Sequence, residues 1–285
     1  MLHLSRNKEG MKTIIGIFLL AIGSVYGQES AIDVPTKNIV KKGSFYAYWG
    51  WNRSLYSSSD IHFKGNNYDF TLTQITAKDR QSKFSFSTYF QTITIPQYNL
   101  RIGYFLNDKY DISFGADHMK YVMVGNQFST ITGNINTGSD YDGVYEGNKI
   151  AINPSFLQFE HTDGLNYLNA EIRRNDKIIS YKKLKINVIE GIGAGVVVPR
   201  SNVTLLNYVR YDQFHLAGFG VGAVLGLNFQ FWDRYFIQFE EKVGYINLPD
   251  IRTTMHEEDR ASQDFTWLQA NFSVGVNFNY KKKVK

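Results

Sequence analysis

The sequence contains no cysteine, only five prolines in 285 residues and a single continuous apolar run. The lack of cysteine excludes a disulfide-stapled scaffold, a thiol nucleophile and a thiolate metal site. The apolar run, residues 14–22, is too short to cross a bilayer as a helix, and the mean hydropathy is −0.29, so a helical membrane protein is excluded as well. The six histidines do not cluster and no HExxH pattern occurs, so we expect neither a metal site nor a cofactor.

Aromatic residues and glycine are abundant. Aromatics make up 15% of the chain, with 19 Tyr and 21 Phe, and there are 24 Gly. Aromatic residues favour strands over helices, and the scarcity of proline is compatible with long strands. The composition therefore predicts an all-β protein.

The strand pattern is clearest near the end of the chain, in NFSVGVNFNY (residues 271–280), where apolar and small polar residues alternate strictly. The same alternation occurs in LAGFGVGAVLGLNFQF (residues 216–231), where glycine occupies much of the second face. Such strands have different surroundings on their two sides. A soluble sandwich would bury the apolar face, whereas an outer-membrane barrel would turn it toward lipid. Glycine on the other face predicts a crowded interior into which neighbouring strands send large side chains.

Segment lengths favour a closed antiparallel transmembrane β-barrel of eight strands, because short turns then lie at one end and long segments at the other. The predicted strands are residues 44–53, 98–106, 110–124, 151–173, 182–198, 213–231, 234–248 and 264–280. The predicted long segments are 53–97, 125–150, 199–212 and 249–263. Ten or twelve strands remain possible, since residues 60–95 could be a hairpin above the membrane or two more strands of the barrel. A β-bulge at Asp163–Gly164 would explain why the apolar face of 151–173 changes sides.

The start of the chain reads as a secretory signal peptide, residues 1–27, with Met11 a possible true initiator. The remaining organisation is a periplasmic segment (28–42), the barrel (43–280) and a basic tail (281–285). Part of the net charge of +5 lies in the leader and the tail, so it carries little weight as evidence for an anionic partner.

With this leader, the alternating strands and the aromatic final strand, the chain resembles the bacterial outer-membrane β-barrel proteins. The resemblance implies Sec-dependent export, insertion by the barrel-assembly machinery and contact with outer-membrane lipids and lipopolysaccharide. It implies no nucleic-acid partner and leaves the oligomeric state open.

The barrel hypothesis assigns three sets of residues. The predicted lipid-facing set is Phe219, Val221, Leu225, Leu227, Phe272, Val274, Val276 and Phe278. The predicted interface aromatics are Trp49, Trp51 and Trp267. The predicted charge cluster of the barrel interior is Arg101, Asp111, Asp117, Glu190, Glu240 and Lys242. An eight-stranded barrel is just wide enough for side chains to fill, so these charges are expected to pair and hold the interior together.

The segment FEHTDGLNYLN (residues 159–169) resembles the active-site strand of the outer-membrane lipid A deacylases. His161 matches the family's histidine, while Asp163 stands where that family has its nucleophilic serine. The resemblance implies a possible esterase site with His161 and Asp163. Three functions follow from the sequence: a non-enzymatic barrel with a structural or surface-interaction role, a deacylase-like esterase, or a narrow channel for small solutes.

Overall fold

The computed structural model describes residues 42–80 and 97–279. The predicted signal peptide, nearly all of residues 28–42, part of the unplaced segment 60–95 and the basic tail lie outside the described residues. The described parts form fourteen strands. They are β1 (Ser44–Tyr56), β2 (Ser59–Gly65), β3 (Tyr68–Ile75), β4 (Ala77–Lys78), β5 (Tyr98–Phe105), β6 (Tyr110–Met123), β7 (Gln127–Ile135), β8 (Gly143–Ile152), β9 (Leu157–Tyr181), β10 (Leu184–Leu205), β11 (Tyr211–Phe214), β12 (Gly218–Phe231), β13 (Tyr235–Arg252) and β14 (Arg260–Asn279).

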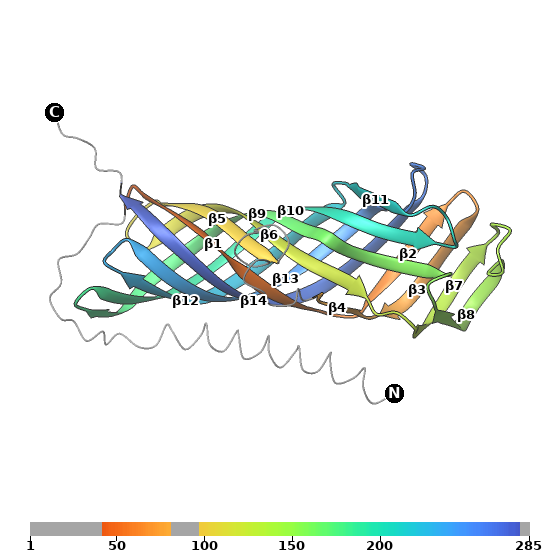
Figure 1. Ribbon diagram of the computed structural model, residues 1–285, viewed down its shortest axis with the longest axis horizontal. Helices are drawn as coiled ribbons and strands as arrows, with labels where there is room; N and C mark the ends of the chain where they lie inside the picture. The colour runs from red at the N-terminus through yellow and green to blue at the C-terminus, as the bar shows by residue number, and fades with distance from the viewer. Residues whose placement is uncertain (1–41, 81–96, 280–285) are drawn as a thin grey trace, which may run out of the picture.

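Eight of these strands close into an antiparallel ring in the order β1, β5, β6, β9, β10, β12, β13, β14 (Figure 1). The ring closes because β1 pairs with β14 along its whole length, from Ser44 opposite Asn279 to Tyr56 opposite Trp267. The prediction of an all-β, closed antiparallel barrel with eight strands is confirmed. No helix in the described part of the chain is long and apolar enough to cross a membrane.

The eight predicted strands correspond one to one with the ring, but several of them extend further than predicted. β9 continues to Tyr181, and β10 continues to Leu205. The short turns β5–β6, β9–β10 and β12–β13 lie at the end of the barrel that also holds Ser44 and Asn279, which we call the terminal end. The long connections lie at the opposite end, the loop end.

Much of what was predicted as loop is sheet. At the loop end, β14 pairs with β2, and the order continues through β3 and β7 to β8. These four strands, with the upper parts of the ring strands, prolong the barrel wall beyond the ring with the same slant (Figure 1). We call these four strands, together with the upper parts of the ring strands beside them, the extension. The prediction of a loop was wrong for residues 125–150, which contain β7 and most of β8. A hairpin, one of the alternatives left open for residues 60–95, is present as β2 and β3: Ile61 and Phe63, and Phe70 and Leu72, place apolar side chains on its inner face.

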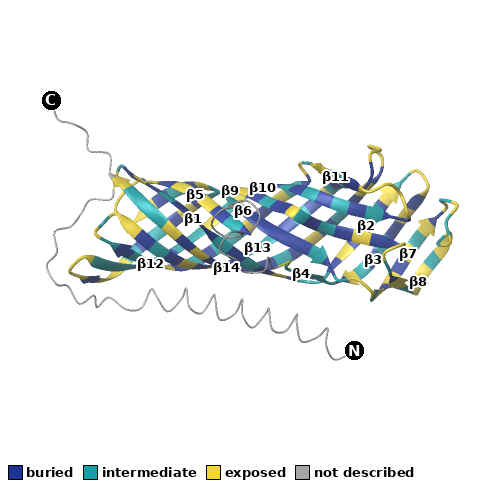
Figure 2. Ribbon diagram, viewed as in Figure 1, coloured by how far each residue is buried: buried dark blue, intermediate teal, exposed yellow. Residues whose placement is uncertain are grey.

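Buried positions alternate with exposed ones along the strands of the wall (Figure 2), and the buried side chains form three layers along the barrel axis. A small aromatic cluster of Tyr46, Tyr48, Phe105 and Phe236 lies toward the terminal end. Buried polar and charged side chains fill the middle of the ring. A large apolar core, which includes Trp267, fills the extension and the upper ring.

The apolar face of single strands changes sides where the middle layer gives way to the apolar core. On β9, Leu157 and Phe159 point into the core, whereas Leu168 and Ile172 are exposed on the outer face. The ladder is irregular there, and Gly164 has φ +130°. The irregularity inserts two residues, since His161 and Leu165 lie opposite Tyr121 and Met119.

An insertion of two residues leaves the odd-numbered side chains of β9 pointing inward on both sides of it. The predicted bulge is therefore present, but it does not explain the switch. The apolar face changes sides because the interior changes: it is polar in the middle of the ring and apolar toward the loop end.

Glycines make room for large interior side chains, as the sequence predicted. A Cβ on Gly115 would lie 2.7 Å from the Arg101 guanidinium, and one on Gly244 would lie 2.7 Å from the Trp267 ring. Close approach of this kind accounts for glycine at alternate positions within strands.

Candidate functional site

The middle layer of the barrel is a network of buried charges centred on Glu171 of β9. Its carboxylate accepts hydrogen bonds from Arg101 of β5 at 2.7 Å, Arg173 of β9 at 2.6 Å and Lys242 of β13 at 3.0 Å. These three cations come from strands on different sides of the ring, so the network ties the walls of the barrel together.

Two further carboxylates complete the network. Arg173 donates to Glu240 at 2.6 Å and to the Tyr48 hydroxyl at 3.0 Å. Lys242 donates to Asp117 at 3.0 Å. Buried charges offset their desolvation cost only when they are paired and hydrogen-bonded, and this set meets that condition. The interior at this level is filled by side chains, as expected for a barrel of eight strands.

The structure brings together five residues of the predicted interior cluster: Arg101, Asp111, Asp117, Glu240 and Lys242 are all buried inside the ring. Glu190 lies elsewhere. Because Ile189 points inward, Glu190 is on the outer face, 3.8 Å from Arg174.

The sequence prediction missed Glu171 and Arg173, which lie at the centre of the network. Both share the inward face of β9 with Asn169 and Asn175. The polar residues at alternate positions of NAEIRRN (residues 169–175) were the available signal.

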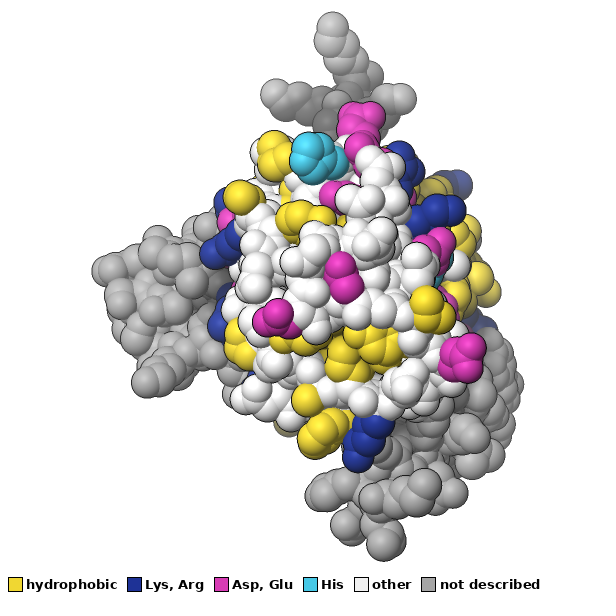
Figure 3. Space-filling model, turned by 90° about the vertical axis from the view of Figure 1, so that its right-hand side faces the viewer, with side chains coloured by type: hydrophobic (Ala, Val, Ile, Leu, Met, Phe, Trp, Pro, Cys, Tyr) yellow, Lys and Arg dark blue, Asp and Glu magenta, His cyan; other side chains and the backbone are white. Residues whose placement is uncertain are grey.

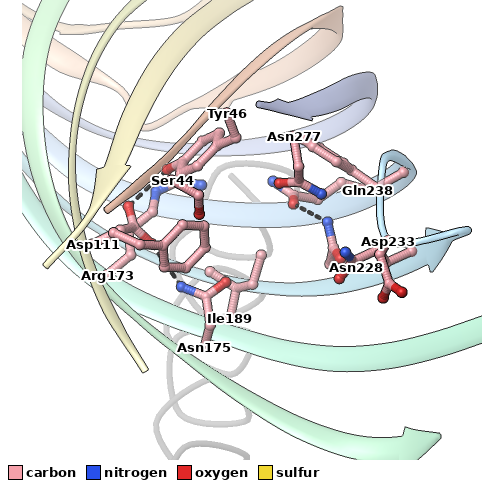
Figure 4. A pocket seen from close by; sticks show the side chains of 13 residues that line it. Ser44, Tyr46, Asp111, Arg173, Asn175, Ile189, Asn228, Asp233, Gln238 and Asn277 are labelled. Atoms are coloured by element: carbon pink, nitrogen blue, oxygen red, sulfur yellow. Dashed lines mark hydrogen bonds between the residues drawn. The ribbon is translucent and has the colours of Figure 1, made fainter. Parts of the chain in front are cut away.

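A small cavity of about 40 Å³ lies between this network and the terminal end. Figure 4 shows Asp111 at its wall, accepting hydrogen bonds from Tyr46 at 2.7 Å and from Asn175 at 2.6 Å, with Asn228 donating to Gln238 opposite. A volume of this size holds a few water molecules. Arg173 lines the cavity and is only 1% exposed, so the cavity ends at the charge network.

The loop end is also filled. In the view onto that end, the side chains of the described residues leave no visible opening into the barrel (Figure 3). Behind this surface lies the apolar core, in which Trp267 meets Tyr167 edge to face and Tyr121 stacks on Phe265. Among the described residues, two layers of packed side chains therefore separate the two ends of the barrel.

The outer face of the ring carries a band of mostly apolar side chains. Large side chains are exposed on every ring strand, for example Phe114 at 66% and Ile192 at 68%. The residues predicted to face lipid lie on this face, and none of them is buried: Phe219, Val221, Leu225, Leu227, Phe272, Val274, Val276 and Phe278. Glu241 also lies on the outer face, between Leu225 of β12 and Ala270 of β14.

Two of the three predicted interface aromatics lie on the outer face. The Trp49 and Trp51 rings meet edge to face, with their centroids 4.6 Å apart, and the Trp51 ring stacks on the Phe272 ring. Trp267 does not join them, because it points inward and is 1% exposed within the apolar core.

His161 lies in the extension, above the apolar outer band, and its side chain points inward with no exposure. Its Nδ1 lies 2.9 Å from the Ser201 hydroxyl of β10, a partner that the sequence did not suggest. The Tyr121 and Phe159 rings pack against the imidazole. Burial without a charged partner lowers the pKa of His161 from 6.5 to about 3.

The structure does not join His161 to Asp163. The Asp163 side chain is half-exposed and pairs with Arg200 at 3.1 Å. A hydrolytic triad needs a carboxylate that orients the imidazole and a hydroxyl within reach of substrate. Ser201 is 3% exposed and enclosed with His161. This pair therefore has neither an orienting carboxylate nor a hydroxyl that substrate can reach.

No family model and no curated protein matches the chain. Among solved structures, the chain is similar to the outer membrane protein OprG of Pseudomonas aeruginosa, with TM-score 0.38, 11% identity and 84% of this chain aligned to 97% of that one. It is also similar to Neisserial surface protein A (TM-score 0.32, 12% identity, 84% and 100% covered) and to Ail, the attachment invasion locus protein of Yersinia pestis (0.27, 9%, 81% and 99%).

The distribution of side chains is the inverse of that in a soluble barrel. Ionic and amide groups fill the interior of the ring, while aliphatic and aromatic groups form an outer band around it. A lipid-facing apolar band, short turns at one end and long connections at the other are the properties of barrels in the outer membrane of bacteria. The chain therefore has the fold and the distribution of side chains of a bacterial outer-membrane β-barrel.

Proposed function

We propose that this barrel is a surface-interaction protein, which holds the extension above the membrane for contact with other macromolecules. The observation that carries the proposal is the construction of the extension. Its four strands pack over an apolar core that includes Phe63, Phe70 and Phe156, all of them buried. A folded sheet presents a fixed surface, whereas mobile loops would not.

The interior does not favour the two alternative functions. A solute would have to pass both the Glu171 network and the apolar core, so a channel is disfavoured. A deacylase would need a reactive group open to lipid, and the His161–Ser201 pair is enclosed.

The proposal is tested by two measurements on refolded protein whose heat-shifted gel mobility shows that the barrel has formed. In a planar bilayer we expect no discrete conductance steps. On intact cells that display the protein, we expect chymotrypsin to leave the extension uncut despite its many aromatic residues, because a paired backbone resists cleavage. Steady conductance steps, or rapid cleavage throughout residues 57–79 and 124–156, would overturn the proposal.

A further inference from the structure

The extension ends in a strand with one open edge. β8 is the last strand of the order and pairs only with β7. Within residues 42–80 and 97–279, no backbone hydrogen bond joins the other edge of β8 to a further strand. An open edge is a template for a strand of another chain.

A bulge and two charged side chains restrict which strands can pair with the open edge of β8. Gly147, with φ +91°, is an extra residue that divides β8 into the segments 143–146 and 148–152. Glu146 and Lys149 flank this bulge, and both are exposed. Bulges and charges on an edge discourage random pairing, so a partner strand must match them.

A second copy of β8, running antiparallel, matches both the bulge and the charges. If Glu146 lies opposite Lys149 of the copy, then Tyr145 lies opposite Ile150 of the copy, and each pair occurs twice. Both side chains point to the same face of the sheet, as a direct pair requires. Glu146 lies opposite Thr132 of β7 and Lys149 opposite Thr130, so both are on the outer face. Opposite charges in direct cross-strand pairs stabilise a sheet.

The geometry of such a contact fixes how the two barrels are oriented. Neighbouring antiparallel strands of one sheet are related by a two-fold axis normal to the sheet. Because the extension continues the barrel wall (Figure 1), that axis runs radially and reverses the direction of the barrel. The two barrels therefore point toward each other and are embedded in opposite membranes.

We propose that β8 is a homotypic adhesion strand, which pairs with β8 of a copy on a facing membrane through two Glu146–Lys149 contacts. This inference deepens the proposed surface-interaction function and rests on it. The proposed binding partner is a second copy of this chain.

The test uses phospholipid vesicles that carry the full chain in two fluorescent colours, and it measures mixed-colour clusters. Wild-type vesicles should cluster. Glu146→Lys vesicles and Lys149→Glu vesicles should each fall to the level of protein-free vesicles, because like charges then face each other. A mixture of the two variants should regain the wild-type level, because the first then presents a lysine at both positions and the second presents a glutamate at both.

Lys64→Glu, an exposed change on β2 away from the edge, is the matched control and should cluster like the wild type. All variants must show the heat-shifted mobility of a folded barrel. Clustering of either single variant at the wild-type level, no recovery in the mixture, or loss with Lys64→Glu would overturn β8 pairing. If wild-type vesicles do not cluster while conductance is silent and the extension resists protease, the homotypic inference fails and the surface-interaction function stands.

Discussion

At the scale of single residues, His161 makes stability depend on pH. The pKa of the buried ring is about 3, against 6.5 for a free histidine, so the unfolded chain binds a proton between these values that the folded chain does not. Above pH 6.5 neither state is protonated there and the effect is absent. As the pH falls from 6.5 toward 3, the free energy of unfolding should decrease by roughly 1.4 kcal/mol per pH unit through this group alone.

Urea unfolding in lipid vesicles, followed at several pH values for the wild type and His161→Gln, measures this contribution. The variant keeps every other titrating group, so the difference between the two pH profiles isolates the imidazole. Parallel profiles would mean that the ring is protonated in the folded protein and that its burial is not as described.

The central charges show what sequence patterns reveal and what they leave out. Alternation placed Arg101, Asp117 and Lys242 on inward faces without any structure. It could not show that Glu171 also binds Arg101 and Lys242 of two other strands, because those contacts depend on the shear and closure of the ring. Trp267 was misplaced since an aromatic near a strand end suits both a membrane interface and a core.

At the scale of elements, the sequence predicted the ring strands and left a hairpin above the membrane open for residues 60–95, but it did not predict β7, β8 or a continuous extension of the wall. The alternation of apolar residues in segments 61–63 and 70–72 was visible in the sequence, but alternation does not reveal which strand a segment pairs with. The reversal of the apolar face within one strand was also visible on β9, where Phe159 points inward and Ile172 outward. Such a reversal marks the level where the wall leaves lipid, because inside and outside exchange polarity there.

The irregularity of β9 yields an element-scale prediction at Gly164. Its φ of +130° is unfavourable for residues with a side chain, and a Cβ would lie 2.4 Å from the Asn166 side chain. Gly164→Ala should therefore lower the free energy of unfolding by about 1–3 kcal/mol. Gly125→Ala, where a Cβ would meet nothing within 4 Å, should change it by less than about 0.5 kcal/mol. Equal effects in urea unfolding would show that the irregularity is not a fixed part of the wall.

At the scale of the whole molecule, the outer band and the extension face different solvents, and this difference can be measured with one type of substitution. Phe114 of β6 and Gln158 of β9 are both exposed and both point outward. Phe114 lies within the apolar band, opposite Ile102 and Ala170, while Gln158 lies in the extension beside Leu157 and Phe159 of the core.

In a soluble barrel, arginine at either position would be tolerated, because an exposed side chain loses little packing. In a bilayer, Phe114→Arg places a charge against hydrocarbon and should cost about 2–4 kcal/mol if the site is near the midplane, whereas Gln158→Arg should cost less than about 0.5 kcal/mol. Urea unfolding of both variants in vesicles of defined lipid gives the two values. Repeating it in vesicles of thinner bilayers should reduce the penalty at Phe114 and leave Gln158 unchanged, because only the first position depends on membrane depth. Equal costs at the two positions would contradict the placement of the band in lipid.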